Sequence, residues 1–399
     1  MLGVLLSVQV IVALAGLAYG KLTALYIPPD EFGTYSLLFA VMTLVHTTFI
    51  APCIQSFKST LAVANPQHTL RFYSQVLGGL YLLIVVVGSG WGWFTQNHTV
   101  ILLIPAVIGQ GLYALSNDYL NLTARHRFFA LLQVLYAMGN VLLFWVLVVQ
   151  AGQRNATGLW INLAILNLLL AGLALWTARR VWRANPSSGK EGEAYPYLRN
   201  LIRYSAPLLG LAFFNWIVNY ADRYLIGYFL TKAEVGYYST GYSVGSRMLL
   251  LAAPFTAQLT PLVFQARSQQ KAASSVNKTV IAYLKIYGLL AATACFVFFV
   301  LHDWFGSVLL SEQYRPAFLI APMIAGGYLF LTGIHLLEVK FYVYGYTKLI
   351  LFHNVIGAFL NLVFGWFFIP YFGIIGAAMA TILCFMIQFC IVLYLFLKK

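Results

Sequence analysis

Long apolar runs alternate with short polar connections along nearly the whole chain. Twelve such runs are predicted as helices, at about 2–26, 33–53, 70–92, 99–122, 128–150, 157–180, 201–229, 236–262, 279–301, 316–337, 347–369 and 373–397. A helix of about 20 residues crosses the roughly 30 Å hydrocarbon core of a bilayer, and the runs are long enough for this. A membrane β-barrel would instead show alternating segments of about ten residues. The pattern predicts an all-α integral membrane protein.

Composition supports this prediction. Hydrophobic residues make up 61% of the 399 positions and charged residues 9%, against about 25% charged in soluble domains. A soluble core of this size has no room for that much apolar surface, so the bilayer must act as the solvent. Helices satisfy every backbone hydrogen bond internally, as a hydrocarbon environment requires.

The chain also carries a half-length repeat. In a first alignment, Glu31, Gly33, Tyr35 and Ser36 recur with the same spacing as Glu234, Gly236, Tyr238 and Ser239. In a second alignment, Asn140, Trp145 and Gly152 recur with the same spacing as Asn361, Trp366 and Gly373. Such repeats are typical of transporters built from two similar bundles with a site between them.

A polar stretch at the midpoint divides the two copies. We therefore predict an N-terminal six-helix lobe at 1–180, a linker at 181–200 and a C-terminal six-helix lobe at 201–399. Six spans is an even number, so both lobes keep the same orientation. Their pseudo-symmetry axis is then expected along the membrane normal.

The net charge of +14 is distributed unevenly. Of the 24 Lys and Arg residues, 18 lie at the termini or in the even-numbered connections, whereas 4 lie in the odd-numbered ones. This positive-inside pattern predicts that both termini and the linker are cytoplasmic. Attraction to anionic lipid explains the basic excess, so no nucleic-acid partner is expected.

Ionisable residues inside the apolar runs are the main candidates for function, because a charge at membrane depth costs about 2.5–3.5 kcal/mol. Arg247 lies in the middle of the eighth run. It either faces a wet substrate cavity or braces neighbouring helices. Asp222 and Arg223 lie in the seventh run, and adjacent helical residues point about 100° apart, so the two are not expected to pair. Asp222 is a candidate for ion coupling. Arg223 either lines the cavity or snorkels to the interface.

Three further residues complete the candidate site. Lys21 lies at the outer end of the first run, opposite Tyr224 in the repeat, and either lines the cavity or snorkels. His46 lies inside the second run and either titrates in ion coupling or packs helices by a hydrogen bond. Tyr242 lies one to two turns from Arg247 and is a candidate to stack on sugars. The other outer aromatic residues either form an interfacial belt, which is the favoured interpretation, or stack on sugars in a cavity open to the outside: Tyr26, Phe32, Tyr35, Trp91, Trp93, Tyr224, Tyr228, Tyr237 and Tyr238.

Signatures of other chemistry are missing from the sequence. There is no Gly-x-x-x-x-Gly-Lys-Ser/Thr phosphate loop, and the Gly-x-Ser-x-Gly spacing at 241–245 falls inside a predicted membrane helix rather than in the strand-to-helix turn of a nucleophile elbow. His335 and Glu338 are three positions apart on one predicted helix, but no second set of metal ligands accompanies them. We therefore expect no metal, no cofactor and no enzymatic activity.

Three segments carry a family resemblance: Asp222–Leu230 followed by Glu234–Ser239, Pro29–Tyr35, and Tyr371–Ala380. In this order and spacing they resemble the bacterial O-antigen and capsule polysaccharide flippases. That family shares its superfamily with multidrug exporters and lipid II flippases. The resemblance covers nearly the whole chain.

The resemblance implies two six-helix lobes in a V around a cavity, which opens alternately to each side. It implies a substrate of undecaprenyl-diphosphate-linked oligosaccharide, moved across the bacterial inner membrane for O-antigen, capsule or exopolysaccharide synthesis. Arg247 matches a position where such flippases place a cavity cation, and Lys21 matches a cationic position of the first helix less closely. Membrane lipids and the polysaccharide polymerase machinery are the other expected partners.

Three alternatives stay open. A cation-coupled multidrug exporter of the same fold would favour an acidic cavity, which Arg247 argues against. A membrane subunit of a glycan polymerase or ligase would need a large outer loop, and the predicted outer connections here are all short. A purely structural membrane subunit is the third.

Overall fold

The computed structural model describes residues 2–61, 63–96, 98–184, 196–270 and 273–398. The chain divides into two compact units, Met1–Phe213 and Phe214–Lys399, and each is described by itself. The predicted linker at 181–200 lies mostly outside the described residues, between the end of helix α7 at Ala184 and the start of α8 at Tyr197.

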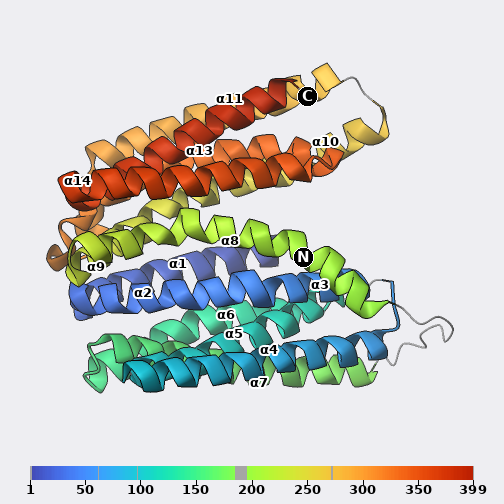
Figure 1. The fold of residues 1–399 in the computed structure, drawn as a ribbon, viewed down its shortest axis with the longest axis horizontal. Coiled ribbons are helices and arrows are strands. Elements are labelled where there is room, and N and C mark those ends of the chain that lie inside the picture. Colours follow the sequence, from blue (N-terminus) through green and yellow to red (C-terminus); the bar gives the residue numbers. More distant parts are fainter. Residues whose placement is uncertain (1, 62, 97, 185–195, 271–272, 399) are drawn as a thin grey trace. The chain divides into compact units, whose positions relative to one another are not determined.

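The first unit is a bundle of long helices joined by short connections (Figure 1). In chain order these are α1 (Leu2–Tyr26), α2 (Pro29–Val45), π-helix η1 (His46–Ile50), α3 (Ala51–Leu61), α4 (Pro66–Thr95), α5 (His98–Leu122), α6 (His126–Phe144), π-helix η2 (Trp145–Gln150), α7 (Ala156–Ala184) and the first half of α8 (Tyr197–Phe229).

The second unit begins within α8 and is helical in the same way. It contains α9 (Lys232–Gly245), 3₁₀-helix η3 (Ser246–Ala252), α10 (Ala253–Ser268), α11 (Ala273–Val300), α12 (His302–Leu309), 3₁₀-helix η4 (Glu312–Tyr314), α13 (Ala317–Tyr344) and α14 (Thr347–Lys398).

The prediction of an all-α membrane protein is confirmed. Among the described residues, eleven helical stretches are long and apolar enough to cross a membrane. The last of these, α14, joins the predicted segments 347–369 and 373–397 across a bend at Gly373, where φ is 59° and ψ is −141°. Glycine adopts this left-handed backbone without the steric cost that a Cβ atom would bring.

The helix boundaries follow the half-length repeat. The first alignment matches the starts of α2 and α9, at Pro29 and Lys232, and the second matches the starts of α6 and α14. Gly152 and Gly373, which the second alignment pairs, both have positive φ, 72° and 59°. Similar backbone requirements at aligned positions explain why glycine occurs in both copies.

The two aligned glutamates, by contrast, stabilise different helix starts. Glu31 accepts a hydrogen bond from the Ala156 backbone N–H at 2.7 Å and so satisfies the first turn of α7. Glu234 instead forms a capping box with Thr231 at the start of its own helix, α9. A carboxylate near a helix N-terminus is favourable in either case, because the free N–H groups there carry partial positive charge.

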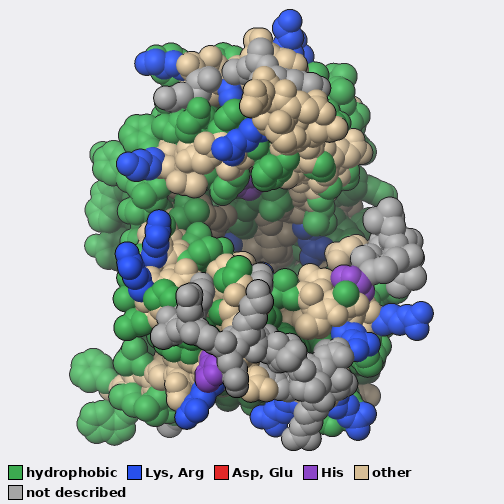
Figure 2. Space-filling view, turned by 90° about the vertical axis from the view of Figure 1, so that its right-hand side faces the viewer, with side chains coloured by type: hydrophobic (Ala, Val, Ile, Leu, Met, Phe, Trp, Pro, Cys, Tyr) green, Lys and Arg blue, Asp and Glu red, His purple; other side chains and the backbone are tan. Residues whose placement is uncertain are grey.

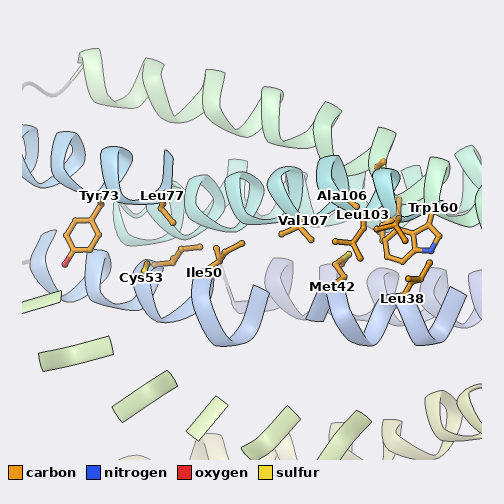
Figure 3. Packing of buried hydrophobic residues seen from close by; sticks show 14 of the residues in the cluster. Leu38, Met42, Ile50, Cys53, Tyr73, Leu77, Leu103, Ala106, Val107 and Trp160 are labelled. Atoms are coloured by element: carbon orange, nitrogen blue, oxygen red, sulfur yellow. The ribbon is translucent and has the colours of Figure 1, made fainter. Parts of the chain in front are cut away.

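The core of the first unit lies between α2, α3, α4, α5 and α7 (Figure 3). Trp160 of α7 is fully buried near Leu38 and Met42 of α2. At Gly109 of α5, an added Cβ would lie 2.8 Å from the Asn167 carbonyl carbon, so α5 and α7 approach very closely. In the second unit α13 has the corresponding central place, packing against α9, α10, α11 and α14.

Basic side chains gather at one end of the helices. Figure 2 views the end of the first unit at which α7 finishes and α8 begins; Lys and Arg side chains are visible there, and no Asp or Glu is visible among the described residues. This is the end that the charge pattern predicts to be cytoplasmic.

Candidate functional site

Asp222 and Arg223 form a buried ion pair on α8. Arg223 Nη1 lies 3.2 Å from Asp222 Oδ1, and the two residues are 3% and 6% exposed. The expectation that they would not pair is therefore wrong. The long arginine side chain turns back over the preceding turn of the helix, as helical side chains tend to do, and Nη1 also donates to the Asn219 carbonyl at 2.5 Å.

Helix α9 supplies the next partner of the Asp222 carboxylate. Tyr238 Oη donates to Asp222 Oδ2 at 2.5 Å, and the backbone N–H of Arg223 donates to Oδ1 at 2.8 Å. The Tyr238 hydroxyl also lies 3.3 Å from Thr381 Oγ1 of α14. Both carboxylate oxygens of Asp222 are thus satisfied by protein donors.

Tyr242 joins the same region one turn further along α9. Its hydroxyl donates to Asn219 Oδ1 at 3.2 Å and lies 3.0 Å from the hydroxyl of Tyr328 on α13. The Arg223 guanidinium lies over the Tyr242 ring, 4.6 Å from its centroid. A cation over an aromatic face gains electrostatic stabilisation, more so away from water.

We name this set the buried polar cluster, and it draws side chains from α8, α9, α13 and α14 of the second unit: Asn219, Asp222, Arg223, Tyr238, Tyr242, Tyr328 and Thr381. Burying a charge is costly unless it is paired and hydrogen-bonded. Asp222 and Arg223 neutralise each other here, which lowers the cost of burying them. The hydrogen bonds of the cluster join four helices. A cation or proton that binds Asp222 would have to compete with Arg223 and Tyr238.

Arg247 lies in η3, the 3₁₀ interruption between α9 and α10, and is half-buried. The preceding helix is held tightly against α13 by two glycines. A Cβ on Gly241 would lie 2.8 Å from Ile320 Cβ, and one on Gly245 would overlap the Ala321 carbonyl oxygen. Small residues four apart allow such close approach between membrane helices. The helix changes to 3₁₀ geometry directly after Gly245. A 3₁₀ stretch within a longer helix often marks a hinge.

His46 and Lys21 belong to the first unit. His46 opens the π-helix η1, and its Nε2 atom is buried with no hydrogen-bond partner among the described residues. The first alignment of the repeat places His46 opposite Leu249, within η3, so His46 and Arg247 occupy matching interruptions of matching helices. Lys21 lies on α1 and is half-buried.

The chain matches a known protein family over most of its length. Residues 24–319 match the family described as "Polysaccharide biosynthesis protein". The chain belongs to this family. The family resemblance is thereby confirmed; the segments around Pro29 and Asp222 lie within the matched residues, and the segment around Tyr371 lies beyond them.

One relative of the chain is the "Probable low-salt glycan biosynthesis flippase Agl15" of Haloferax volcanii, 27% identical over 233 residues. That match covers 56% of this chain and 47% of the relative, so the chain spans about half of the relative's length.

Solved structures share the fold. "Lipid II flippase MurJ, inward closed conformation" superposes with a TM-score of 0.76 at 14% identity, covering 99% of this chain and 87% of that one. An inward-facing multidrug resistance MATE family transporter of the MOP superfamily gives 0.71 at 13% identity, covering 99% and 98%. This member of the polysaccharide biosynthesis family therefore has the fold of MOP superfamily transporters.

Sequence reasoning missed four members of the buried polar cluster, Asn219, Tyr238, Tyr328 and Thr381. The prediction that Tyr238 belongs to the interfacial aromatic belt is wrong, because its side chain is fully buried. Two helical spacings were the available signals: Tyr238 is four positions before Tyr242, and Asn219 is four positions before Arg223. Tyr328 and Thr381 carry no local signal.

A second buried polar group joins α13 to α14. His353 Nε2 donates to Glu338 Oε1 at 2.9 Å, and the Gln388 side-chain amide donates to His353 Nδ1 at 2.9 Å. The sequence singled out Glu338 only for its spacing from His335. Within the described residues, no group of three or more His, Cys, Asp and Glu lies close enough together to hold a metal ion.

Proposed function

We propose that this protein is a flippase that moves a lipid-linked oligosaccharide across a membrane by alternating access. The observation that carries the proposal is membership of a polysaccharide biosynthesis family on a MOP transporter fold. The name of the Haloferax volcanii relative, "Probable low-salt glycan biosynthesis flippase Agl15", supports the same activity.

The substrate we propose is undecaprenyl-diphosphate-linked oligosaccharide, carried from the cytoplasmic to the outer leaflet of the bacterial inner membrane. A diphosphate cannot cross hydrocarbon without compensating cations, whereas the isoprenoid chain can stay in lipid throughout. The product would serve O-antigen, capsule or exopolysaccharide synthesis, with the polysaccharide polymerase machinery as the next partner.

Arg247 is the residue we assign to the diphosphate, because its planar guanidinium presents paired donors that suit phosphate oxygens. Lys21 is the second cation of this proposal. Arg223 has a lesser part, because its charge is already paired with Asp222. The Tyr242 hydroxyl is hydrogen-bonded to Asn219 and Tyr328, and the Arg223 guanidinium lies over the Tyr242 ring.

We assign ion coupling first to His46, whose Nε2 is buried without a partner among the described residues. Asp222 is the second candidate, and coupling there would require the Tyr238 and Arg223 contacts to open. Either residue would link the return of the empty transporter to a proton or cation gradient.

The test is a flipping assay in proteoliposomes containing a fluorescently labelled undecaprenyl-diphosphate oligosaccharide. A membrane-impermeant quencher should bleach about half of the label in protein-free vesicles, and nearly all of it when the protein is present. Efflux of ethidium from the same vesicles tests the multidrug alternative. Ethidium transport without movement of the labelled glycolipid would reject the proposed function.

A further inference from the structure

A groove of about 610 Å³ lies in the first unit between α4, α5 and α7. Helix α5 packs against both α4 and α7. The lining is mostly apolar, with Leu70 and Leu77 from α4, Leu112 and Leu115 from α5, and Leu175 from α7. No residue of the buried polar cluster lines this groove, so it is a separate feature.

The groove runs along the helices from the basic end toward mid-membrane. Its lining on α4 extends from Gln67 to Tyr81, which at 1.5 Å per residue is about 21 Å. One leaflet contributes roughly 15 Å of hydrocarbon, half of the core thickness. The groove therefore has the length of a single lipid chain with its head group.

Two arginines stand at one end of the groove. Arg71 of α4 and Arg179 of α7 both line it, one near the start of α4 and the other near the end of α7. Neither belongs to any ion pair among the described residues. Arg180, the neighbour of Arg179, lies instead over the Trp176 ring at 3.8 Å.

The apolar part of the groove is open because a side chain is missing. Gly78 lines it, and a Cβ added there would meet no atom within 4 Å. The adjacent face of α4 exposes Leu82 and Val86, at 66% and 62%, as expected for a helix that contacts lipid. An apolar groove at this depth must fill with hydrocarbon, because an empty one would forfeit its dispersion contacts.

We propose that this groove binds a glycerophospholipid with an anionic head group, one acyl chain lying along α4 and the phosphate held by Arg71 and Arg179. Arginine pairs bind phosphate oxygens through charge-assisted hydrogen bonds. Basic pockets between membrane helices on the cytoplasmic side are a known form of lipid-specific site. Lipid binding in this groove does not depend on what the protein transports.

Native mass spectrometry of the purified full chain, titrated with phosphatidylglycerol or phosphatidylcholine, tests the site. We expect one phosphatidylglycerol to bind more tightly than phosphatidylcholine. The double variant Arg71→Gln/Arg179→Gln should bind it roughly 30-fold more weakly, at about fivefold per basic residue. Arg180→Gln, which removes a neighbouring charge outside the groove, should leave the affinity unchanged.

A second pair of variants tests the apolar part. Gly78→Leu should fill the groove and abolish tight binding of phosphatidylglycerol. Gly79→Leu is the matched control, because its Cβ also has free space but Gly79 does not line the groove. Glycerol phosphate, which lacks acyl chains, should not displace the bound lipid.

Four results would overturn the proposal. The first is equal phosphatidylglycerol affinity in the wild type and the double arginine variant. The second is identical behaviour of Gly78→Leu and Gly79→Leu. The third is displacement of the lipid by glycerol phosphate, which would indicate an anion site. The fourth is displacement by equimolar undecaprenyl phosphate, which would indicate that the groove holds an isoprenoid lipid.

Discussion

The two arginines of the second unit that the sequence singled out have different surroundings. Arg223 is almost fully buried, lies between two tyrosine rings and is neutralised by Asp222 on the same helix. Arg247 is half-buried in a 3₁₀ segment. A buried, paired arginine mainly contributes to structure, whereas a partly accessible one can exchange its contacts for those of a ligand.

Replacing Asp222 by alanine should destabilise the protein strongly. Arg223 would stay buried without its carboxylate, which costs on the order of 3–5 kcal/mol. The double variant Asp222→Ala/Arg223→Met removes both charges and should recover much of that loss. Thermal unfolding in detergent, followed for both variants, measures the difference. Equal loss in the single and double variants would show that an unpaired Arg223 is not the cause of the destabilisation.

Replacing Arg247 by alanine should reduce flipping without reducing the amount of inserted protein. The expected rate is lower by roughly ten- to a hundredfold, since a hydrogen bond to a charged group contributes about 1.5–3 kcal/mol. Arg247→Lys keeps the charge but loses the paired donors, and should retain part of the activity. Normal flipping by the alanine variant would remove Arg247 from the proposed site, and low abundance would assign it to helix packing.

At the scale of elements, the contact between α9 and α13 decides where the buried polar cluster and η3 lie. Gly241 and Gly245 allow the two helices to approach until the glycine backbone meets Ile320 and Ala321. Because Tyr242 stands between these glycines and Arg247 follows the second, their positions depend on this close packing.

Gly245→Ala should therefore separate α9 from α13 and destabilise the second unit by about 1–3 kcal/mol, the usual cost of overpacking. Gly288→Ala on α11 is the control, because its Cβ would meet nothing within 4 Å. That variant should be neutral or more stable by up to about 1 kcal/mol, since alanine is the better helix former. Thermal unfolding of both variants provides the comparison, and equal melting temperatures would show that the glycine contact is not tight.

At the scale of the whole molecule, the repeat and the charge pattern remain the guides to topology. Each unit begins its second long helix at the same point of the repeat, and the interruptions of these helices, η1 and η3, overlap in the repeat. The division into lobes at 1–180 and 201–399, and their pseudo-symmetry, stay predictions.

The membrane orientation can be tested by cysteine labelling in a variant whose four native cysteines are replaced. A cysteine at Gln153, in the connection between η2 and α7, should react with an impermeant reagent added from outside. A cysteine at Ser188, in the predicted linker, should react only after the membrane is permeabilised. The reverse pattern would show that the positive-inside interpretation is wrong.

Local signals were enough to predict the membrane-spanning helices, but not the short helix α12. Length and apolarity identify membrane spans because a hydrocarbon solvent allows almost no other backbone structure. Repeated glycines such as Gly152 and Gly373 could be found in advance because each answers a local backbone requirement. Asp222, Arg223 and Tyr242 could be proposed because charged or polar side chains inside an apolar run are costly and therefore conspicuous.

Which side chains meet was settled only by the packing of helices far apart in the sequence. Tyr328 reaches Tyr242 from α13, and Thr381 reaches Tyr238 from α14, both much later in the chain. The Asp222–Arg223 pair depends on a side-chain rotamer. The groove beside Gly78 depends on how α4, α5 and α7 diverge. Spacing along one helix specifies a face, but the partner of that face depends on the tertiary structure.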